Sequence, residues 1–528
     1  MNHLKASDAF RTMGVATIIM MTSIFLSRVT GIAREMVLAA LAGAGTEVDA
    51  YRVAFVLPEI LNHILASGFL SVTFIPIFSR YLAEGKEIDG WRTFSNISTV
   101  FGVLLIVLIA AGMIVAPSVV PLLAPGRQDP QFIALAVRMT RITLPAQFFF
   151  FAGGMLMAVQ YAKKRFLFPA LAPLIYNLGI ISGGWLLGRR LGVEGFCWGA
   201  LAGAAIGSFA IQIVGAVRIG ITFRPVIDFT HPDIRRYVLL TLPLMIGLTM
   251  VFSTELFSKF FGSFLSAGAI AWIDYAMRVM LMLVGFFGQA VGVASYPYMA
   301  QLAVQGRLSE LNDIINTLLR YLSIVIPVSV LVAVLRHEIV YVLFERGRFS
   351  PEDTKMTALT LSCLMVGAIA FISQTVVNRG FYATQNTLLP AVFGTIAVVL
   401  SLPMYWIGLK LFGVAGVGLA ISASAILQTI LLFSVWNRRS NNTAAIGVYR
   451  AYLNATIGAL VIGAILWSVH GALQMRLDGQ TLVTNLAVIS VVSGVFVGLT
   501  GLWGWIFKIE AIQYVFSRIA SSNFLKKS

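Results

Sequence analysis

The chain has 528 residues, of which 58% are hydrophobic and only 11% are charged, and its mean hydropathy is +0.88. This composition excludes an ordinary water-soluble globular protein, because most of the chain cannot face water. The net charge of +16 does not indicate nucleic-acid binding, because the basic residues lie in short loops between apolar runs. Strand-period alternation is absent from those runs, which excludes a transmembrane β-barrel.

Apolar runs long enough to cross a bilayer as helices, which takes roughly 20 residues each, follow one another along the chain. We therefore expect an all-α integral membrane protein with about 14 transmembrane helices. The expected spans are 12–42, 50–83, 93–116, 131–162, 166–188, 193–217, 236–262, 267–304, 310–344, 354–384, 387–411, 414–437, 447–471 and 481–507. The first run lacks a cleavage pattern, so we expect it to be retained. Residues 508–528 alternate apolar and basic residues and are expected to lie along the membrane surface.

The basic residues favour one side of the membrane. Loops on one side contain Lys5, Arg11, Lys163, Lys164, Arg165, Arg218, Arg224, Arg235, Arg236, Arg438, Arg439, Lys526 and Lys527. By the positive-inside rule this side is cytoplasmic, which places both termini inside the cell. The opposite side has fewer basic residues, namely Arg189, Arg190, Arg346 and Arg348. The positive-inside rule therefore appears here as an excess of basic residues on the cytoplasmic side, with exceptions on the other side.

A repeat with an offset of 221 residues runs through the chain. The segment 126–130, Gly-Arg-Gln-Asp-Pro, resembles the segment 347–351, Gly-Arg-Phe-Ser-Pro. The same offset relates Tyr161-Ala162 to Tyr382-Ala383, Pro169-Ala170 to Pro390-Ala391, Gly192-Val193 to Gly413-Val414, Pro76 to Pro297 and Gly85 to Gly306. A constant offset indicates duplication of a six-helix unit. Because six is even, we expect a parallel repeat with lobes at 1–222 and 223–442, followed by two helices and a cytoplasmic tail in 443–528.

Candidate functional residues are the ionisable ones inside apolar spans, because each costs roughly 2.5–3.5 kcal/mol at a helix centre. Arg28 and Arg34 lie six residues apart in the first span, with Gly31 between them and Glu35 following. On an ideal helix the two arginines are about 120° apart. A kink at Gly31 would turn both toward one cavity, whereas the alternative is that they reach toward the interface.

The second span begins with Asp49 and Arg52, whose spacing allows an ion pair on one helix face. Asp49 is equally suited to be the N-cap of that helix. Glu59, Asn62, His63 and Ser67 then form a polar stripe at helical spacing. A lone histidine in such a stripe is more often a hydrogen-bonded core residue than a ligand.

In the second copy, Asp274 precedes Arg278 by four residues, and Glu255 precedes Lys259 by four. Both spacings suit ion pairs within one helix. We interpret Glu255 and Lys259 as a self-neutralising pair and Arg278 as a substrate-binding cation. Arginine suits this role because its planar group binds phosphate oxygens in pairs and keeps its charge when poorly hydrated. Arginines that face each other across two lobes predict an anionic, phosphate-bearing substrate.

These residues resemble the MviN/MurJ family, the lipid II flippases of the multidrug/oligosaccharidyl-lipid/polysaccharide exporter superfamily. The resemblance covers nearly the whole chain and rests on residues 27–35 (SRVTGIARE), 43–45 with Asp49-Ala50, 54–58, 344–349 (FERGRF) and 379–383 (RGFYA) leading to Pro390. It implies fourteen helices in two lobes, alternating access, and cavity arginines that hold a pyrophosphate. By position, Arg28, Arg34 and Arg278 would be those arginines, Glu35 stands where the family usually has Asp, and Asp49 keeps an acidic position near the outer gate.

The chain departs from the family pattern at several positions. Asn62 and His63 replace a basic pair, so His63 or Arg52 is a candidate replacement for one cavity cation. Ser67 replaces a customary glutamate, Asn386 replaces an acidic residue, and Ser258 replaces a possible sodium ligand. These differences leave open a sodium site and also the choice between lipid II and another undecaprenyl-linked saccharide. The substrate-binding candidates are Arg28, Arg34, Arg278, Glu35, Asp49, Arg52, Asn62 and His63.

Two other classes compete with a flippase. A polyprenyl-linked glycosyltransferase would need paired carboxylates or an acidic metal motif in a loop, and the sequence has neither. A drug/cation antiporter would need membrane-embedded carboxylates where this chain has arginines. The two cysteines, Cys197 and Cys363, lie far apart in apolar segments and are interpreted as core residues. We expect a monomeric transporter with no metal or cofactor, in contact with membrane lipids and driven by membrane potential or an ion gradient, since no Walker motif is present.

Overall fold

The computed structural model describes residues 2–63, 69–477 and 481–506, and in these ranges the chain is almost entirely helical and has no strand. The first part of the chain forms α1 (Asn2–Ala42), α2 (Thr46–Ala54), α3 (Val56–Leu61), α4 (Phe69–Ala83), α5 (Glu87–Leu123), α6 (Pro130–Thr143), α7 (Ala146–Ala162), α8 (Leu167–Leu191), α9 (Glu194–Gly203) and α10 (Ile211–Arg218). A π-helical segment, Ala204–Ala210, joins α9 to α10.

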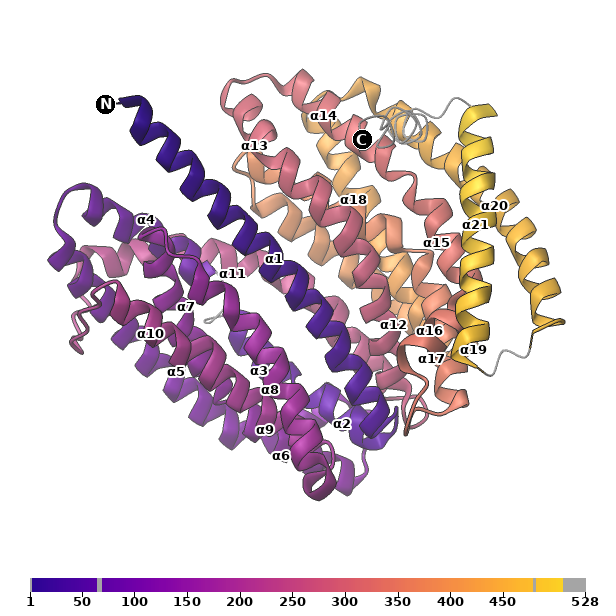
Figure 1. The fold of residues 1–528 in the computed structure, drawn as a ribbon, viewed down its shortest axis with the longest axis horizontal. Coiled ribbons are helices and arrows are strands. Elements are labelled where there is room, and N and C mark those ends of the chain that lie inside the picture. The colour runs from indigo at the N-terminus through magenta and orange to yellow at the C-terminus, as the bar shows by residue number, and fades with distance from the viewer. Residues whose placement is uncertain (1, 64–68, 478–480, 507–528) are drawn as a thin grey trace, which may run out of the picture. The chain divides into compact units, whose positions relative to one another are not determined.

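The second part forms α11 (Pro232–Gly262), α12 (Ala269–Val284), α13 (Ala290–Val304), α14 (Leu308–Leu322), α15 (Val325–Val334), α16 (Arg336–Phe344), α17 (Pro351–Met365), α18 (Ala368–Ala383), α19 (Leu388–Arg439), α20 (Ile446–Gln474) and α21 (Leu482–Ile506). A π-helical segment, Gly285–Gln289, joins α12 to α13. Figure 1 shows these helices along the chain.

The expected all-α membrane architecture is confirmed. Among the described residues, nine helical stretches are long and apolar enough to cross a membrane, and α17 with α18 forms a tenth that is bent by 46°. Within the described residues, each of the fourteen expected segments is largely helical, but several are broken; the second, for example, contains α2, α3 and α4. The total of fourteen crossings stays a prediction.

By their internal contacts, the residues form two compact units. Unit 1 comprises residues 1–248, 266–271 and 346–349, and unit 2 comprises residues 249–265, 272–345 and 350–528. The short segments 266–271 and 346–349 thus belong to unit 1, although the sequence around them belongs to unit 2. The lobe boundaries at 222 and 442 remain sequence-based predictions.

The backbone repeats at the same 221-residue offset as the sequence. Four pairs of positions have positive φ values: Gly85 and Gly306 (71° and 70°), Lys164 and Gln385 (58° and 58°), Gly192 and Gly413 (58° and 57°), and Gly220 and Asn441 (81° and 50°). Asp129 and Ser350, also 221 residues apart, each N-cap a helix that begins with proline. Left-handed backbone is uncommon outside glycine, so its recurrence in register indicates duplicated local structure.

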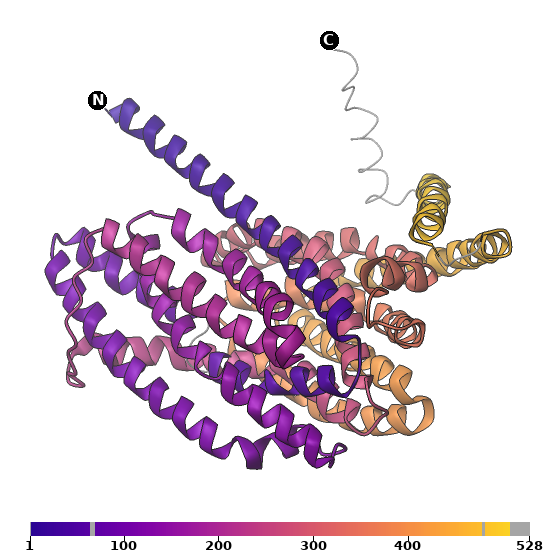
Figure 2. The same cartoon turned by 60° about the horizontal axis from the view of Figure 1, so that its bottom comes forward.

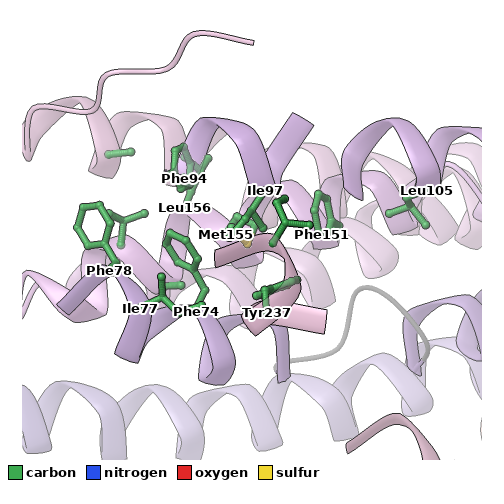
Figure 3. Packing of buried hydrophobic residues seen from close by; sticks show 14 of the residues in the cluster. Phe74, Ile77, Phe78, Phe94, Ile97, Leu105, Phe151, Met155, Leu156 and Tyr237 are labelled. Atoms are coloured by element: carbon green, nitrogen blue, oxygen red, sulfur yellow. The ribbon is translucent and has the colours of Figure 1, made fainter. Parts of the chain in front are cut away.

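Each unit is held together by buried apolar side chains. In unit 1 a cluster of aromatic and aliphatic residues from α4, α5 and α7 surrounds Tyr237 of α11 (Figure 3). Phe74 and Phe78 of α4 are fully buried there. In unit 2, α20 and α21 lie beside each other (Figure 2, yellow) and pack on α15 and α16 through residues such as Val334 and Leu466.

Helices α8 and α9 approach each other along a row of glycines. A Cβ atom added to Gly179 would lie 2.6 Å from the Cα of Gly203. One added to Gly183 would overlap the backbone of Gly199 and would lie 2.5 Å from the carbonyl oxygen of Gly195. In a membrane, such close packing of small residues holds helices together where the hydrophobic effect does not.

This packing predicts that Gly183→Ala destabilises the protein, by about 1–3 kcal/mol, because the added methyl group meets backbone that cannot move aside. The matched control is Gly188→Ala in the same helix, where an added Cβ meets nothing within 4 Å. Thermal unfolding of the detergent-purified protein should show a lower midpoint for Gly183→Ala only. Equal midpoints for both variants would contradict the close packing of α8 on α9.

Candidate substrate-binding site

Glu35 of α1 is a buried carboxylate that holds two arginines. Its Oε1 atom accepts a hydrogen bond from Nη2 of Arg34 at 2.6 Å, and its Oε2 atom accepts one from Nη2 of Arg52 at 2.6 Å. Glu35 is 2% exposed and Arg52 5% exposed. Charge-assisted bonds of this kind fix the orientation of both guanidinium groups. The structure therefore brings together three of the predicted site residues, from α1 and α2.

Arg34 also reaches α8, where its Nη1 donates to Oδ1 of Asn177 at 3.2 Å. The amide nitrogen of Asn177 in turn lies 3.2 Å from the carbonyl oxygen of Ser27. Gly31 faces this contact, since a Cβ added there would lie 3.8 Å from the Asn177 amide nitrogen. The helix α1 is continuous through Gly31, so the proposed kink is replaced by a close approach of α8. The sequence analysis missed Asn177, although a lone asparagine in an apolar helix is an indication of such a partner.

Arg28 lies one to two turns before Arg34 on α1 and is exposed. No hydrogen bond or ion pair joins its guanidinium to any other residue in the described ranges. The two arginines of the first span therefore differ: Arg34 is fixed by Glu35 and Asn177, and Arg28 is available to a ligand.

Asp49 is completely buried in unit 1, and its partners differ from the predicted one. Oδ2 accepts bonds from the backbone nitrogen of Gly268 at 2.8 Å and from Nη2 of Arg127 at 3.2 Å, and Oδ1 accepts one from the nitrogen of Ala271 at 2.9 Å. The expected Asp49–Arg52 pair is thus replaced, because Arg52 binds Glu35. The N-cap interpretation is also wrong: α2 begins at Thr46, and the Asp49 carboxylate instead caps the first turn of α12.

The polar stripe after Asp49 is only partly described. Asn62 and His63 directly follow α3 and are half-buried, and Nδ1 of His63 lies 2.7 Å from the carbonyl oxygen of Glu59. Ser67 lies outside the described residues. The replacement of a cavity cation by His63 therefore stays a prediction.

In unit 2, four charged residues of α11 and α12 form a second cluster. Lys259 Nζ lies 2.8 Å from Oε1 of Glu255, as the spacing predicts, and Arg278 Nε lies 3.5 Å from Oδ2 of Asp274. Glu255 also lies 4.0 Å from Nη2 of Arg278, so the two predicted pairs are neighbours. Asp274 and Lys259 are buried, and Arg278 is one-third exposed.

The two clusters differ in charge balance. In unit 1, the carboxylate of Glu35 binds two arginines, Arg34 and Arg52. In unit 2, two cations face two carboxylates. Excess cations in an apolar segment are tolerated where water or an anion meets them. The unit 1 cluster can therefore bind an anion outright, whereas Arg278 can bind one only by exchanging carboxylate contacts for it.

Within the described residues, no group of three or more His, Cys, Asp or Glu side chains has the geometry of a metal site.

Comparison with known proteins assigns the family. The family model described as lipid II flippase MurJ matches residues 38–488. The probable lipid II flippase MurJ of Vibrio cholerae is 26% identical over 469 residues, which cover 85% of this chain and 88% of the relative. The lipid II flippase MurJ of Burkholderia cenocepacia is 27% identical over 449 residues, covering 84% and 87%.

Solved structures show the same fold. A lipid II flippase MurJ in an inward closed conformation superposes with a TM-score of 0.74 at 21% identity, covering 93% of this chain and 99% of that one. An inward-facing multidrug resistance MATE family transporter of the MOP superfamily gives a TM-score of 0.64 at 13% identity, covering 79% and 94%. Since the family model spans most of the chain and the fold agrees, this chain is a member of the lipid II flippase MurJ family.

Proposed function

We propose that this chain is a flippase that moves lipid II, a lipid-linked peptidoglycan precursor, across the bacterial cytoplasmic membrane by alternating access. Membership of the MurJ family and the names of its relatives support the assignment. The observation in the structure that carries it is the cluster of Arg34, Glu35 and Arg52, with Arg28 close by on α1. The chain is a transporter and not an enzyme.

The chemistry of the unit 1 cluster suits a pyrophosphate. Glu35 uses one oxygen for each arginine, which leaves the other guanidinium hydrogens of Arg34 and Arg52 already oriented. Phosphate oxygens accept such donors in pairs, and an oriented donor loses less conformational entropy on binding than a mobile one. Arg28 adds a third cation. The cluster thus recognises the charged part of a lipid-linked sugar and does not select for the sugar itself.

Arg278 is proposed to contact the same anion in a conformation in which Asp274 and Glu255 release it. Both carboxylates lie within ion-pair distance of Arg278, at 3.5 and 4.0 Å. Lys259 lies closer to Glu255, at 2.8 Å, and can neutralise it when Arg278 leaves.

The alternatives fit the described residues less well. A cation antiporter needs an unneutralised carboxylate in its cavity, and Glu35 is held by two arginines. A flippase for another undecaprenyl-linked saccharide would use the same phosphate contacts, because these contacts do not read the sugar. Lipid II is preferred because the family's relatives bear that name.

The chain is a multi-pass protein of the bacterial inner membrane. We further propose that both termini are cytoplasmic, that the chain acts as a monomer, and that membrane potential or an ion gradient drives transport. The charge distribution between loops supports the orientation. Transport of an anion toward the positive side of the membrane is itself favoured by the potential, by about 2.3 kcal/mol per charge per 100 mV.

The arginine assignment predicts that Arg28→Ala, Arg34→Ala and Arg278→Ala each weaken binding of undecaprenyl pyrophosphate by about tenfold or more. Each loss removes charge-assisted bonds worth roughly 1.5–3 kcal/mol. Lysine at the same positions should restore binding only in part, because an ammonium group cannot form the paired contacts. The measurement is a binding titration of the purified protein, with folding checked by thermal unfolding.

Arg307→Ala is the matched control, because Arg307 is exposed and pairs with Glu310 outside both clusters. It should bind like the wild type. His63→Ala tests the substituted cation: if His63 contributes, its removal weakens binding. Unchanged binding would remove His63 from the site. Full-strength binding by the triple alanine variant would overturn the arginine assignment as a whole.

The orientation predicts that the loops at 163–165 and 224–236 face the cytoplasm. Single cysteines introduced at Arg165 and Arg235, both exposed, should stay unlabelled by an impermeant maleimide added to intact cells and react after the cells are opened. A cysteine at Arg190, also exposed, is the matched control and should react in intact cells. The opposite labelling pattern would reverse the topology.

A further inference from the structure

A cavity of about 370 Å³ lies in unit 1, at the ends of α1 and α8 and away from the Arg34–Glu35–Arg52 cluster. It is lined by residues 40–42 at the end of α1, by Gly184, Trp185, Gly188 and Arg189 of α8, by Gly192, Val193 and Phe196 after it, and by Gly347 and Arg348. Its volume is within the range of small-molecule sites, roughly 300–1,000 Å³. No step of the proposed transport uses it.

Beside the cavity, the backbone of residues 347–348 lies close to the end of α1. The backbone nitrogen of Arg348 donates to the carbonyl oxygen of Ala40 at 2.9 Å. A Cβ atom on Gly347 would overlap that carbonyl group, and one on Gly43 would lie 2.5 Å from the carbonyl oxygen of Arg348. On the opposite wall, Gly188 leaves open space where a Cβ atom would meet nothing within 4 Å.

Two arginines at the cavity have no assigned partner. Arg189 and Arg348 both line it and both are exposed. In the described part of the chain, neither guanidinium forms an ion pair or a hydrogen bond. Oε2 of Glu47 lies 3.7 Å from where a Cβ on Gly192 would be, but Glu47 does not line the cavity. The charged side chains that line the cavity are the two arginines, which favours an anionic ligand.

The walls of the cavity are apolar and open onto an apolar surface. Trp185 lines it and is 69% exposed, and Leu41 lines it and is 38% exposed. The neighbouring Leu186 is 66% exposed. Exposed tryptophan and arginine near a helix end are typical of the membrane interface, where lipid headgroups lie. A ligand that satisfies both parts of the site carries a charged group and a hydrocarbon chain.

We propose that this cavity binds the phosphate headgroup of an anionic membrane phospholipid, with Arg189 and Arg348 on the phosphate and the acyl chains along Trp185 and Leu41. Two of the four arginines that depart from the positive-inside bias, Arg189 and Arg348, thereby acquire a role. The bound lipid would bridge α8 to the segment 346–349, which comes from the second copy of the repeat but packs in unit 1. It would thus stabilise the backbone hydrogen bond between Arg348 and Ala40.

A purely structural explanation exists for one of these cations. Arg189 and Arg190 both lie in the last turn of α8, where a positive charge stabilises the helix dipole. Arg190 shares that position and exposure but does not line the cavity. A substitution of Arg190 therefore distinguishes a helix-dipole effect from ligand binding.

The test titrates the full-length, purified protein with phosphatidylglycerol and reads bound lipid by native mass spectrometry, with phosphatidylcholine as the uncharged reference. The Arg189→Gln/Arg348→Gln variant should bind phosphatidylglycerol about tenfold or more weakly, while Arg190→Gln should bind like the wild type. Gly188→Leu should fill the cavity and also weaken binding. Its control is Gly498→Leu in α21, another position where an added Cβ meets nothing within 4 Å.

Equal phosphatidylglycerol binding by the double variant and the wild type would overturn the proposal, as would equal weakening by Arg190→Gln. Saturation of the site by inorganic phosphate at the same affinity would refute an amphiphilic ligand. Loss of undecaprenyl pyrophosphate binding in the double variant, with phosphatidylglycerol binding retained, would assign the cavity to the transported lipid instead. Because phosphatidylglycerol binding needs no transport, its result stands apart from the proposed flippase function.

Discussion

An ionised side chain inside a membrane protein must be met by an opposite charge, by water or by a ligand, and the charged clusters of this chain follow from that requirement. Glu35 supplies the opposite charge for Arg34 and Arg52 in unit 1, and Asp274 and Glu255 supply it for Arg278 in unit 2. Breaking a buried pair of this kind costs about 3–5 kcal/mol, far more than a surface pair contributes. The excess of cations in unit 1 then determines what the site can bind.

The duplication supplies the framework on which these clusters lie. Left-handed backbone at Gly192 and Gly413 ends one helix and starts the next in each copy. The two copies use one residue type differently: Arg127 of the first copy binds Asp49, while its counterpart Arg348 lines a cavity. The same arginine thus holds a carboxylate in one copy and is exposed at a cavity in the other.

Much of this could be predicted from the sequence, because local patterns determine it. The apolar runs predict the helices, the 221-residue offset predicts the matching turns, and i to i+4 spacing predicts both the Glu255–Lys259 and the Asp274–Arg278 contacts. The errors concern partners distant in sequence. Asp49 has three donors at positions 127, 268 and 271, and no spacing within α2 could indicate them. Asn177 is 143 residues from Arg34 and was missed for the same reason.

Glu35 is the anion that orients Arg34 and Arg52 for phosphate binding. Replacing that one charge tests this role most directly. Thermal unfolding of Glu35→Gln should show a lower midpoint than the wild type, because the buried Arg52 and the partly buried Arg34 lose their shared partner. Undecaprenyl pyrophosphate should then raise the midpoint of Glu35→Gln more than that of the wild type, since the ligand replaces the missing charge. Glu35→Asp, which keeps the charge, should resemble the wild type in both respects. A Glu35→Gln variant that is as stable as the wild type and gains no more from the ligand would contradict the account.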